Sequence, residues 1–187
     1  IVKRLVGSEM CIRDSHNNRH NIGFKVVDAI NQKFGLSKQK PKFKGLLTTG
    51  NIGEKKIYAI KPLTFMNNSG ICIRELLEYF KIDAEDVIVF HDDLDVEFGK
   101  IKAKFGGSSA GHNGVASIDK FIGKDYSRVR IGIGKPENKM SVSDFVLNDF
   151  SDDEQEYLEK ITHNIIDSIA ILIDKKLDLF SSKVNNN

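Results

Sequence analysis

Near the middle of the chain stands the stretch VIVFHDD, residues 87–93. Its four consecutive apolar residues are typical of a strand that is buried on both faces, as in sheets that helices cover on either side. Segments with strand and helix patterns alternate before and after this stretch. We therefore expect an α/β fold, in which one domain spans residues 1–187 and a mixed, mostly parallel twisted sheet is flanked by helices on both faces.

Further strands are predicted where short runs of apolar or β-branched residues occur. They lie at residues 2–7, 46–49, 57–60, 101–105 and 129–133. A turn at 51–54 joins the second and third of these runs as a hairpin. In 101–105 the apolar residues alternate with lysines, so this strand is predicted to have one apolar and one basic face.

Apolar residues at helical spacing predict the helices. They lie at about 21–34, 73–80, 115–122 and 151–175. The last of them begins with Ser151, followed three residues later by Glu154, which is the pattern of a capping box. Residues 184–187 are predicted to form a frayed tail.

The composition, with 40% hydrophobic and 29% charged residues, is that of an ordinary globular domain. No apolar run approaches the roughly 20 residues that span a bilayer, and the first residues lack the pattern of a secretory signal. Cys11 and Cys72 form neither a disulfide framework nor a metal-ligand spacing. We therefore expect a cytoplasmic protein. Its net charge of +2 neither requires nor excludes a polyanionic partner.

His20 and Asp92 are candidates for acid–base chemistry. An imidazole titrates near neutral pH, so His20 can take a proton from water as a general base. Asp92 lies just past the predicted buried strand, where a carboxylate can accept a hydrogen bond from an imidazole and hold its tautomer. Each residue by itself also has a plain interpretation, as a histidine at the start of a helix and as a solvated acid in a loop.

Asn67 and Asn113 are polar candidates at the ends of predicted elements. Asn67 can bind a substrate, or it can simply cap the second helix, because asparagine is favoured at that position. Asn113 belongs to the glycine-rich segment 106–114. Such a segment can shape a turn or allow the backbone to approach a ligand closely, so both interpretations stay open.

Other kinds of site have weaker support. His91 and the three aspartates at 92, 93 and 95 offer hard ligands for a divalent metal, as a phosphohydrolase would use. However, neighbouring residues of a strand point to opposite faces, and no second ligand cluster is present in the sequence. The glycines at 106–114 match neither the dinucleotide fingerprint nor the Walker pattern. No serine lies in GxSxG and neither cysteine lies near a histidine motif, which favours activated water over a covalent nucleophile.

Five ordered segments resemble the motifs of bacterial peptidyl-tRNA hydrolases. They are RHNIGF at 19–24, KPLTFMNNSG at 61–70, HDDLDVEFGK at 91–100, GHNG at 111–114 and RVRIGIGKP at 128–136. Each motif is weak by itself. Five of them in family order, from residue 19 to residue 136, are far more specific.

The resemblance implies roles for the residues at the matching positions. The histidine of RHN implies that His20 is the base that activates water, and the first aspartate of HDDLD implies that Asp92 keeps His20 basic. The asparagines of FMN and GHN imply that Asn67 and Asn113 position substrate and water. Either amide, or a backbone N–H of segment 106–114, can donate to the ester carbonyl.

Four more positions are implied to contact the substrate. Phe65 and Met66 would line the site, where an aromatic face can stack on a terminal base or ribose. Lys104, the last lysine before the glycine-rich segment, and Arg130, the second arginine of RVR, are similar to a family pair that clamps tRNA phosphate. Apart from the resemblance, the lysines of 101–105 are more typical of a solvated strand face.

The match breaks before His20. The family opens with a strand, a GxGNPG-like loop and a tyrosine before the catalytic histidine, whereas this chain has SEMCIRDS at 8–15. Met10 stands where the family has an asparagine that is implied to check for a blocked amino group, and Ser15 stands at the tyrosine position. We interpret residues 8–15 as foreign to the gene, a sequencing or assembly artefact, with a diverged loop as the alternative.

The expected function is hydrolysis of the ester between peptide and tRNA, with the acceptor stem and 3′ end of peptidyl-tRNA as the partner. An aminoacyl ester is labile, so a positioned base that accelerates the reaction ~10²–10⁴-fold suffices without a metal or cofactor. We expect the protein to act as a monomer. The alternative is a non-catalytic RNA-binding relative that lost turnover through the altered loop at 8–15.

Overall fold

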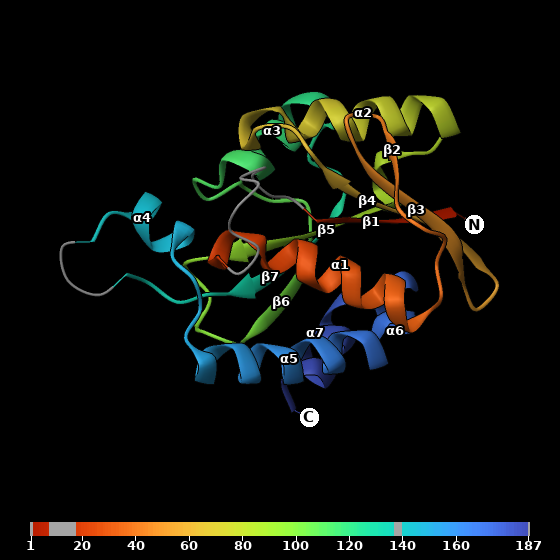
Figure 1. Ribbon diagram of the computed structural model, residues 1–187. Coiled ribbons are helices and arrows are strands. Elements are labelled where there is room, and N and C mark those ends of the chain that lie inside the picture. The colour runs from red at the N-terminus through yellow and green to blue at the C-terminus, as the bar shows by residue number, and fades with distance from the viewer. Residues whose placement is uncertain (1, 8–17, 137–139, 187) are drawn as a thin grey trace.

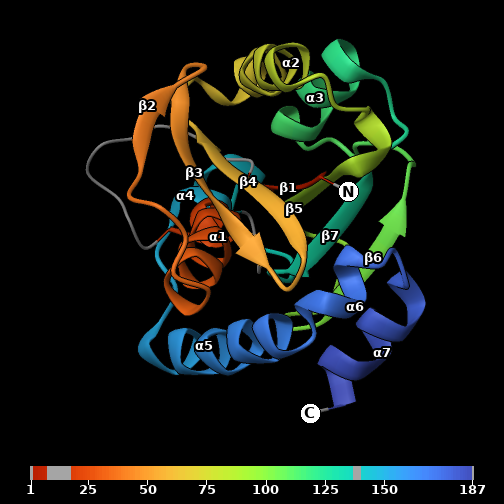
Figure 2. The same ribbon diagram turned by 90° about the vertical axis from the view of Figure 1, so that its right-hand side faces the viewer.

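The computed structural model describes residues 2–7, 18–136 and 140–186, in which a seven-stranded sheet lies between two layers of helices (Figures 1 and 2). The strands are β1 Val2–Gly7, β2 Lys40–Lys42, β3 Gly45–Ile52, β4 Lys55–Pro62, β5 Val87–Asp93, β6 Ile101–Phe105 and β7 Ser127–Gly132. The helices are α1 Ile22–Lys33, α2 Ser69–Phe80, α3 Asn113–Ile122, α4 Val142–Leu147, α5 Asp152–Asp167, α6 Ile169–Ile173 and α7 Leu177–Asn186. The 3-10 helices are η1 Arg19–Asn21, η2 Met66–Asn68 and η3 Ala84–Asp86. No helix in the described parts of the chain is long and apolar enough to cross a membrane.

The order of the described strands is β2-β3-β4-β1-β5-β7-β6. The pairs β4–β1, β1–β5 and β5–β7 are parallel. The pairs β2–β3, β3–β4 and β6–β7 are antiparallel. The prediction of a mixed sheet is therefore confirmed, whereas the prediction of mostly parallel pairing is wrong. Turns of two residues join β2 to β3 and β3 to β4, and a parallel neighbour would need a crossover of a dozen or so residues.

β5 has the double burial that its apolar run predicts, and all of its residues are buried. Ile88 and Phe90 belong to the apolar cluster with α1, α5, α6 and α7. Val87 and Val89 belong to the cluster with α2 and α3 on the opposite face. The strand runs through Asp93, so Asp92 lies within the part of β5 that pairs with β7. The prediction that Asp92 lies just past the strand is therefore wrong.

The C-terminal region differs from the predicted single helix over 151–175. α5 ends at Asp167, and α6 follows after Ser168, which is fully buried. The chain then reverses at Lys175, whose φ of 61° lies in the left-handed region. The apolar period continues across the break because α5 and α6 cover the same cluster, so periodicity alone does not reveal where one helix stops.

Residues 184–186 of the predicted frayed tail instead form the last turn of α7, and Val184 is fully buried, while Asn187 lies outside the described residues. α7 packs along β6, the edge strand of the sheet. The Asn185 side chain accepts a hydrogen bond from the Ile101 N–H at 2.9 Å and donates one to the Ile101 carbonyl at 2.8 Å. Ser181 Oγ accepts from the Ala103 N–H at 2.8 Å. The helix therefore satisfies backbone groups that an open edge would expose to another chain.

We expect Asn185→Ala to lower the free energy of unfolding by about 2 kcal/mol, because two hydrogen bonds to the edge strand disappear and its groups lose their partners. Urea unfolding of the purified chain measures the change. Asn186→Ala is the matched control, since Asn186 is an exposed neighbour whose side chain donates only to Ser182. Equal losses in the two variants would contradict a specific role of Asn185.

Candidate active site

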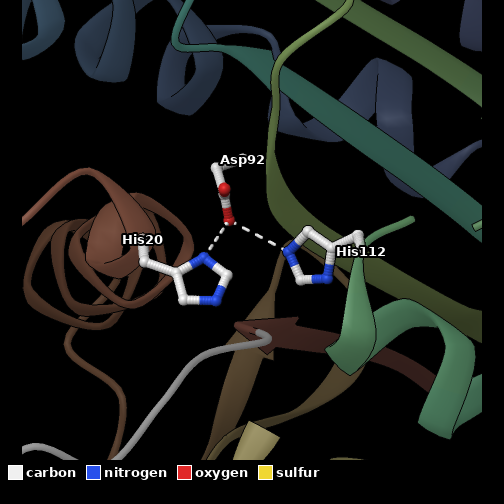
Figure 3. A group of neighbouring side chains, drawn as sticks. All are labelled: His20, Asp92 and His112. Atoms are coloured by element: carbon white, nitrogen blue, oxygen red, sulfur yellow. Dashed lines mark hydrogen bonds and ion pairs between the residues drawn. The ribbon is translucent and has the colours of Figure 1, made fainter. Parts of the chain in front are cut away.

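The candidate active site lies at the carboxyl end of β5, where the first turns of two helices meet it. Figure 3 shows the Asp92 carboxylate between the imidazoles of His20 and His112. His20 comes from η1, directly before α1, and His112 is the N-cap of α3. The carboxyl ends of parallel strands are the usual place for sites in α/β sheets, and α-helices begin there.

One carboxylate oxygen holds both rings. His20 Nδ1 lies 2.8 Å from Asp92 Oδ1, and His112 Nε2 lies 3.0 Å from the same oxygen. The centroids of the two imidazoles are 5.1 Å apart. An ionised carboxylate only accepts hydrogen bonds, so both ring nitrogens that face Asp92 carry the hydrogen.

The backbone of α3 determines the tautomer of His112. Its Nδ1 accepts a hydrogen bond from the Val115 N–H at 3.2 Å, so the ring proton lies on Nε2 and points at Asp92. His20 has its proton on Nδ1 for the same carboxylate. The opposite nitrogen of His20, Nε2, keeps its lone pair, and no group in the described parts of the chain hydrogen-bonds to it. Through this lone pair His20 can accept a proton and act as a base.

Asp92 is only 3% exposed, and its charge state follows from two opposing effects. Burial by itself raises the pKa of the carboxyl, because it disfavours the charged form. The nearby imidazoles of His112 and His20, together with their hydrogen bonds, outweigh burial and lower the pKa of Asp92 well below its usual range. Asp92 is therefore ionised at neutral pH and can stabilise a protonated His20.

A third histidine lies behind this pair. His91 is buried, and its Nδ1 donates to the Asp92 backbone carbonyl at 2.7 Å. Its ring packs edge-on against His112, with centroids 5.0 Å apart, and its Nε2 is buried without a hydrogen-bond partner among the described residues. Burial, followed by the neighbouring His112, lowers the pKa of His91 to about 3. His91 is therefore neutral and forms part of the packing under the site.

A cavity of about 440 Å³ opens beside His20, Asp92 and His112. Part of its wall belongs to α4, a short helix beyond the start of α1 (Figure 1). The α4 residues in this wall are Val142, Ser143, Val146 and Leu147. The cavity is thus lined by a cluster of polar groups together with apolar side chains, which is the usual composition of a small-molecule or peptide site.

The four predicted residues around this cavity have different positions. Met66 and Asn113 line it. Phe65 is 72% exposed just before η2, and Asn67 is exposed within η2, so neither belongs to the cavity wall. Asn68 takes the N-cap position of α2, without a side-chain cap, and this excludes the alternative interpretation of Asn67 as the cap.

Lys104 and Arg130 are brought together on one face of β6 and β7. Lys102 is the cross-strand partner of Arg130, which makes Lys104 its diagonal neighbour. Partial burial, then the charges of Arg130 and Arg128, lower the pKa of the Lys104 ammonium. Arg130 donates from Nε and Nη2 to Asp93 at 2.6 and 3.0 Å. Two aligned cations with one carboxylate leave an excess of positive charge beside the cavity.

The ligand cluster considered at 91–95 does not converge on one point. Asp93 is bound to Arg130, and Asp95 is paired with Lys135 at 3.0 Å on the surface. His91 turns its only free nitrogen into the protein interior. A metal site built from this segment would have to break each of these contacts.

His20, Asp92 and His112 do bring three ligand atoms within 4.8 Å of one another. A metal would need the lone pair of His112 Nε2, but that atom carries the proton because Nδ1 accepts from Val115. Moving the proton to Nδ1 would point it at the Val115 N–H and remove the cap of α3. The donor set therefore fits a hydrogen-bonded triad better than a metal centre.

His112 was not predicted as a site residue, and Asp93 was considered only as a possible metal ligand and not as the partner of Arg130. The signal for His112 was present, since a histidine directly before a predicted helix can cap it through its ring, but this is a rare choice of cap. The partner of Asp93 could not be recognised from spacing, because Arg130 belongs to a strand 37 residues later. Met10 and Ser15 lie outside the residues that the structure describes.

Comparison with known proteins gives one consistent result. A family model described as peptidyl-tRNA hydrolase matches residues 13–187. The peptidyl-tRNA hydrolase of Pelagibacter ubique is 83% identical over 173 residues, which are 92% of this chain and 93% of that protein. The peptidyl-tRNA hydrolase of Ehrlichia canis is 44% identical over 168 residues, 90% of this chain and 86% of the relative. The crystal structure of peptidyl-tRNA hydrolase from Acinetobacter baumannii superimposes with a TM-score of 0.90 at 31% identity, covering 98% of this chain and 94% of the other.

His91 makes the folded state sensitive to acid. The pKa of His91 is 6.5 in the unfolded chain and about 3 in the folded chain, so between these pH values the unfolded chain binds one more proton than the folded chain. The free energy of unfolding therefore decreases as the pH falls from 6.5 toward 3, and this decrease is absent above pH 6.5. We expect His91→Asn, which cannot be protonated, to reduce the slope of unfolding free energy against pH in this range by up to about 1.4 kcal/mol per pH unit.

Urea unfolding at a series of pH values measures this slope. His163→Asn is the matched control, because His163 is exposed on α5, and its slope is expected to equal that of the parent chain. Identical slopes in parent, His91→Asn and His163→Asn would show that His91 is not the group responsible.

Proposed function

The chain belongs to the peptidyl-tRNA hydrolase family and is a hydrolase that acts on peptidyl-tRNA, and we propose that it cleaves the ester through a water molecule that His20 activates. The observation that carries this proposal is the arrangement of His20 between a carboxylate and a cavity. Nδ1 is held by Asp92, while Nε2 keeps its lone pair. An imidazole in this state is a general base with a defined orientation.

The reaction follows from these positions. Nε2 of His20 takes a proton from water while the water oxygen attacks the ester carbonyl, and the ionised Asp92 stabilises the imidazolium that forms. When the tetrahedral intermediate collapses, the carbon–oxygen bond to the ribose breaks. The imidazolium returns its proton to the departing ribose oxygen. Peptide acid and free tRNA are the products, so atoms and charges balance with one water consumed.

Asn113 is the best-placed donor for the ester carbonyl, since it lines the cavity next to the His112 cap. One such donor is worth roughly 10²–10³ in rate. Met66 lines the same cavity, and the exposed Phe65 beside it offers a face on which the terminal base or ribose can stack. Asn67 lies in the same short helix and is proposed to contact substrate outside the cavity.

Lys104 and Arg130 are proposed to hold a phosphate of the acceptor stem. Arg130 uses two of its N–H groups on Asp93, and the remaining ones are free to bind an anion. The Lys104 ammonium has no ion pair within the described residues and stands among like charges, which a bound phosphate would neutralise. Such contacts position tRNA without reading its sequence.

No step of this mechanism uses a metal or cofactor, and the tautomer of His112 supports that design. We propose that the protein acts as a monomer, because the proposed mechanism requires no group beyond those that this chain supplies. We also propose a cytoplasmic location, where charged tRNA is found. The thiol of Cys72 is free and buried, and burial raises its pKa to about 12, so it is an inert core residue.

We interpret the protein as one domain over 1–187 in which residues 8–15 are foreign to the gene. Support comes from the family match, which begins only at residue 13. In this view Met10 and Ser15 say nothing about how the native enzyme checks its substrate. Sequencing the source DNA across this junction separates an artefact from a diverged loop.

Release of N-blocked amino acid from N-blocked aminoacyl-tRNA tests the mechanism. We expect His20→Ala to lower kcat by about 10²–10⁴-fold, because the base is lost. Asp92→Asn should cause a loss of similar size, because the amide can donate to Nδ1 and leave the proton on Nε2. His163→Ala, which removes an exposed histidine of α5, should retain full activity.

Unchanged turnover by His20→Ala would exclude His20 as the base. Tight tRNA binding by a parent chain that shows no turnover would favour the alternative, a non-catalytic RNA-binding protein.

Removal of Lys104 tests the phosphate site. We expect Lys104→Gln to weaken tRNA binding and to flatten its dependence on salt, by roughly 0.7–0.9 on a log–log plot for one lost phosphate contact. Binding titrations of tRNA at several salt concentrations give this slope. Lys33→Gln is the control, since Lys33 lies at the end of α1 that is remote from His20. The assignment fails if both variants keep the slope of the parent chain.

A further inference from the structure

Arg19 is the neighbour of His20 in η1, but its side chain contacts a different part of the molecule. Its guanidinium Nη1 donates to the backbone carbonyls of Asn148 and Asp149 at 3.2 and 2.6 Å. Its Nη2 donates to both carboxylate oxygens of Glu154, at 3.1 and 2.8 Å. The backbone N–H of Arg19 also donates to the Asn148 carbonyl at 3.0 Å. All of these partners lie at the junction of α4 and α5.

Aromatic rings enclose the same guanidinium. Its central carbon lies 4.7 Å from the centroid of Phe145 and 5.1 Å from that of Phe150. The side chain of Arg19 is only 11% exposed, and its charge is matched by Glu154. An arginine beside a proposed catalytic base suggests a phosphate ligand. Arg19, however, is largely desolvated, and its guanidinium is already paired with the carboxylate of Glu154. Its planar fork fits this junction in a way that a lysine ammonium cannot reproduce.

The element that Arg19 holds is the α4 wall of the cavity. α4 has six residues, all within the described part of the chain, and none of them is fully buried. Its packing on the body of the protein is therefore weak compared with that of a core helix. One of its faces lines the cavity that His20 also lines, and Phe145 on another face packs against Arg19. The same η1 turn thus carries the proposed base and supports the α4 part of the cavity wall.

We propose that Arg19 is a positioning residue that couples α4 to His20, so that the wall and the base keep one relative geometry around the ester. The proposal rests on His20 being the base. A displacement of about 1 Å between substrate and catalytic group can cost roughly 10²-fold in rate, so a loosened wall is expected to lower turnover although Arg19 touches neither water nor ester. Binding of tRNA phosphate, which we propose for Lys104 and Arg130 on β6 and β7, is expected to be unaffected.

The test compares three variants by steady-state kinetics with N-blocked aminoacyl-tRNA and by thermal unfolding. Arg19→Lys keeps the charge and loses the fork. Glu154→Gln keeps the capping box of α5, because glutamine also accepts from the Ser151 N–H, and removes the charge that pairs with Arg19. Ser151→Ala is the matched control, since it removes the cap of α5 without removing a group that Arg19 contacts.

We expect Arg19→Lys to lower kcat by about 10-fold or more with KM within about threefold of the parent, and Glu154→Gln to change kcat in the same direction by less. Ser151→Ala should lower the Tm and leave kcat unchanged at temperatures where the chain is folded. Two results would overturn the proposal: a lower Tm of Arg19→Lys with kcat intact, which means a purely structural role, or a raised KM with kcat intact, which means a substrate ligand. His20→Ala, measured alongside, reports separately on the proposed function, because an active His20→Ala contradicts the base whatever Arg19 does.

Discussion

Asp92 carries a charge at the end of a central strand, in a place from which the protein excludes most of the water. An isolated carboxylate in such a position costs several kcal/mol and would instead become protonated. Two imidazole N–H groups prevent this by donating to the same oxygen. One imidazole belongs to η1 before α1 and the other to the start of α3, so a single electrostatic requirement holds three distant segments in one arrangement. The orientation of His20, the proposed base, and one part of the cavity wall depend on it.

The histidines that satisfy Asp92 are supported from behind in different ways. His112 is held by the Val115 N–H, so the first turn of α3 determines which ring nitrogen carries the proton. Among the described residues the His20 ring has no such backbone contact, and the neighbouring Arg19 instead ties the η1 turn to the α4–α5 junction. One imidazole is thus held by a helix terminus, and the turn that carries the other is tied down by Arg19, which forms a part-buried ion pair with Glu154 and packs against Phe145 and Phe150. The second arrangement also includes α4, which lines the same cavity as His20.

Consecutive residues of β5 serve different purposes because neighbouring side chains of a strand project to different sides. Asp92 binds the two histidines, Asp93 binds Arg130, and His91 remains neutral in the packing below. The carboxylate that holds the proposed base and the carboxylate that holds Arg130 of the proposed phosphate site are therefore neighbouring residues of one strand. The same division explains why four potential metal ligands within five residues do not gather around a common centre.

Local patterns in the sequence determined much of the fold and the choice of chemistry. Strand β5, helix α1, the hairpin of β3 and β4 and the capping box at Ser151 depend on residues close together in the chain, so periodicity and capping preferences identify them. His20 and Asp92 were recognised because their residue types suit acid–base chemistry and their motifs occur in family order. The tertiary structure decided which groups meet: His20 and Asp92 are 72 residues apart, and His112, Asp93 and Arg19 acquire their roles from partners 20, 37 and more than 100 residues away. It also decided the antiparallel pairing of β6, the break at Ser168 and the packing of the last turn of α7. These features depend on how elements that are distant in the chain pack against one another, and no short stretch of sequence determines that packing.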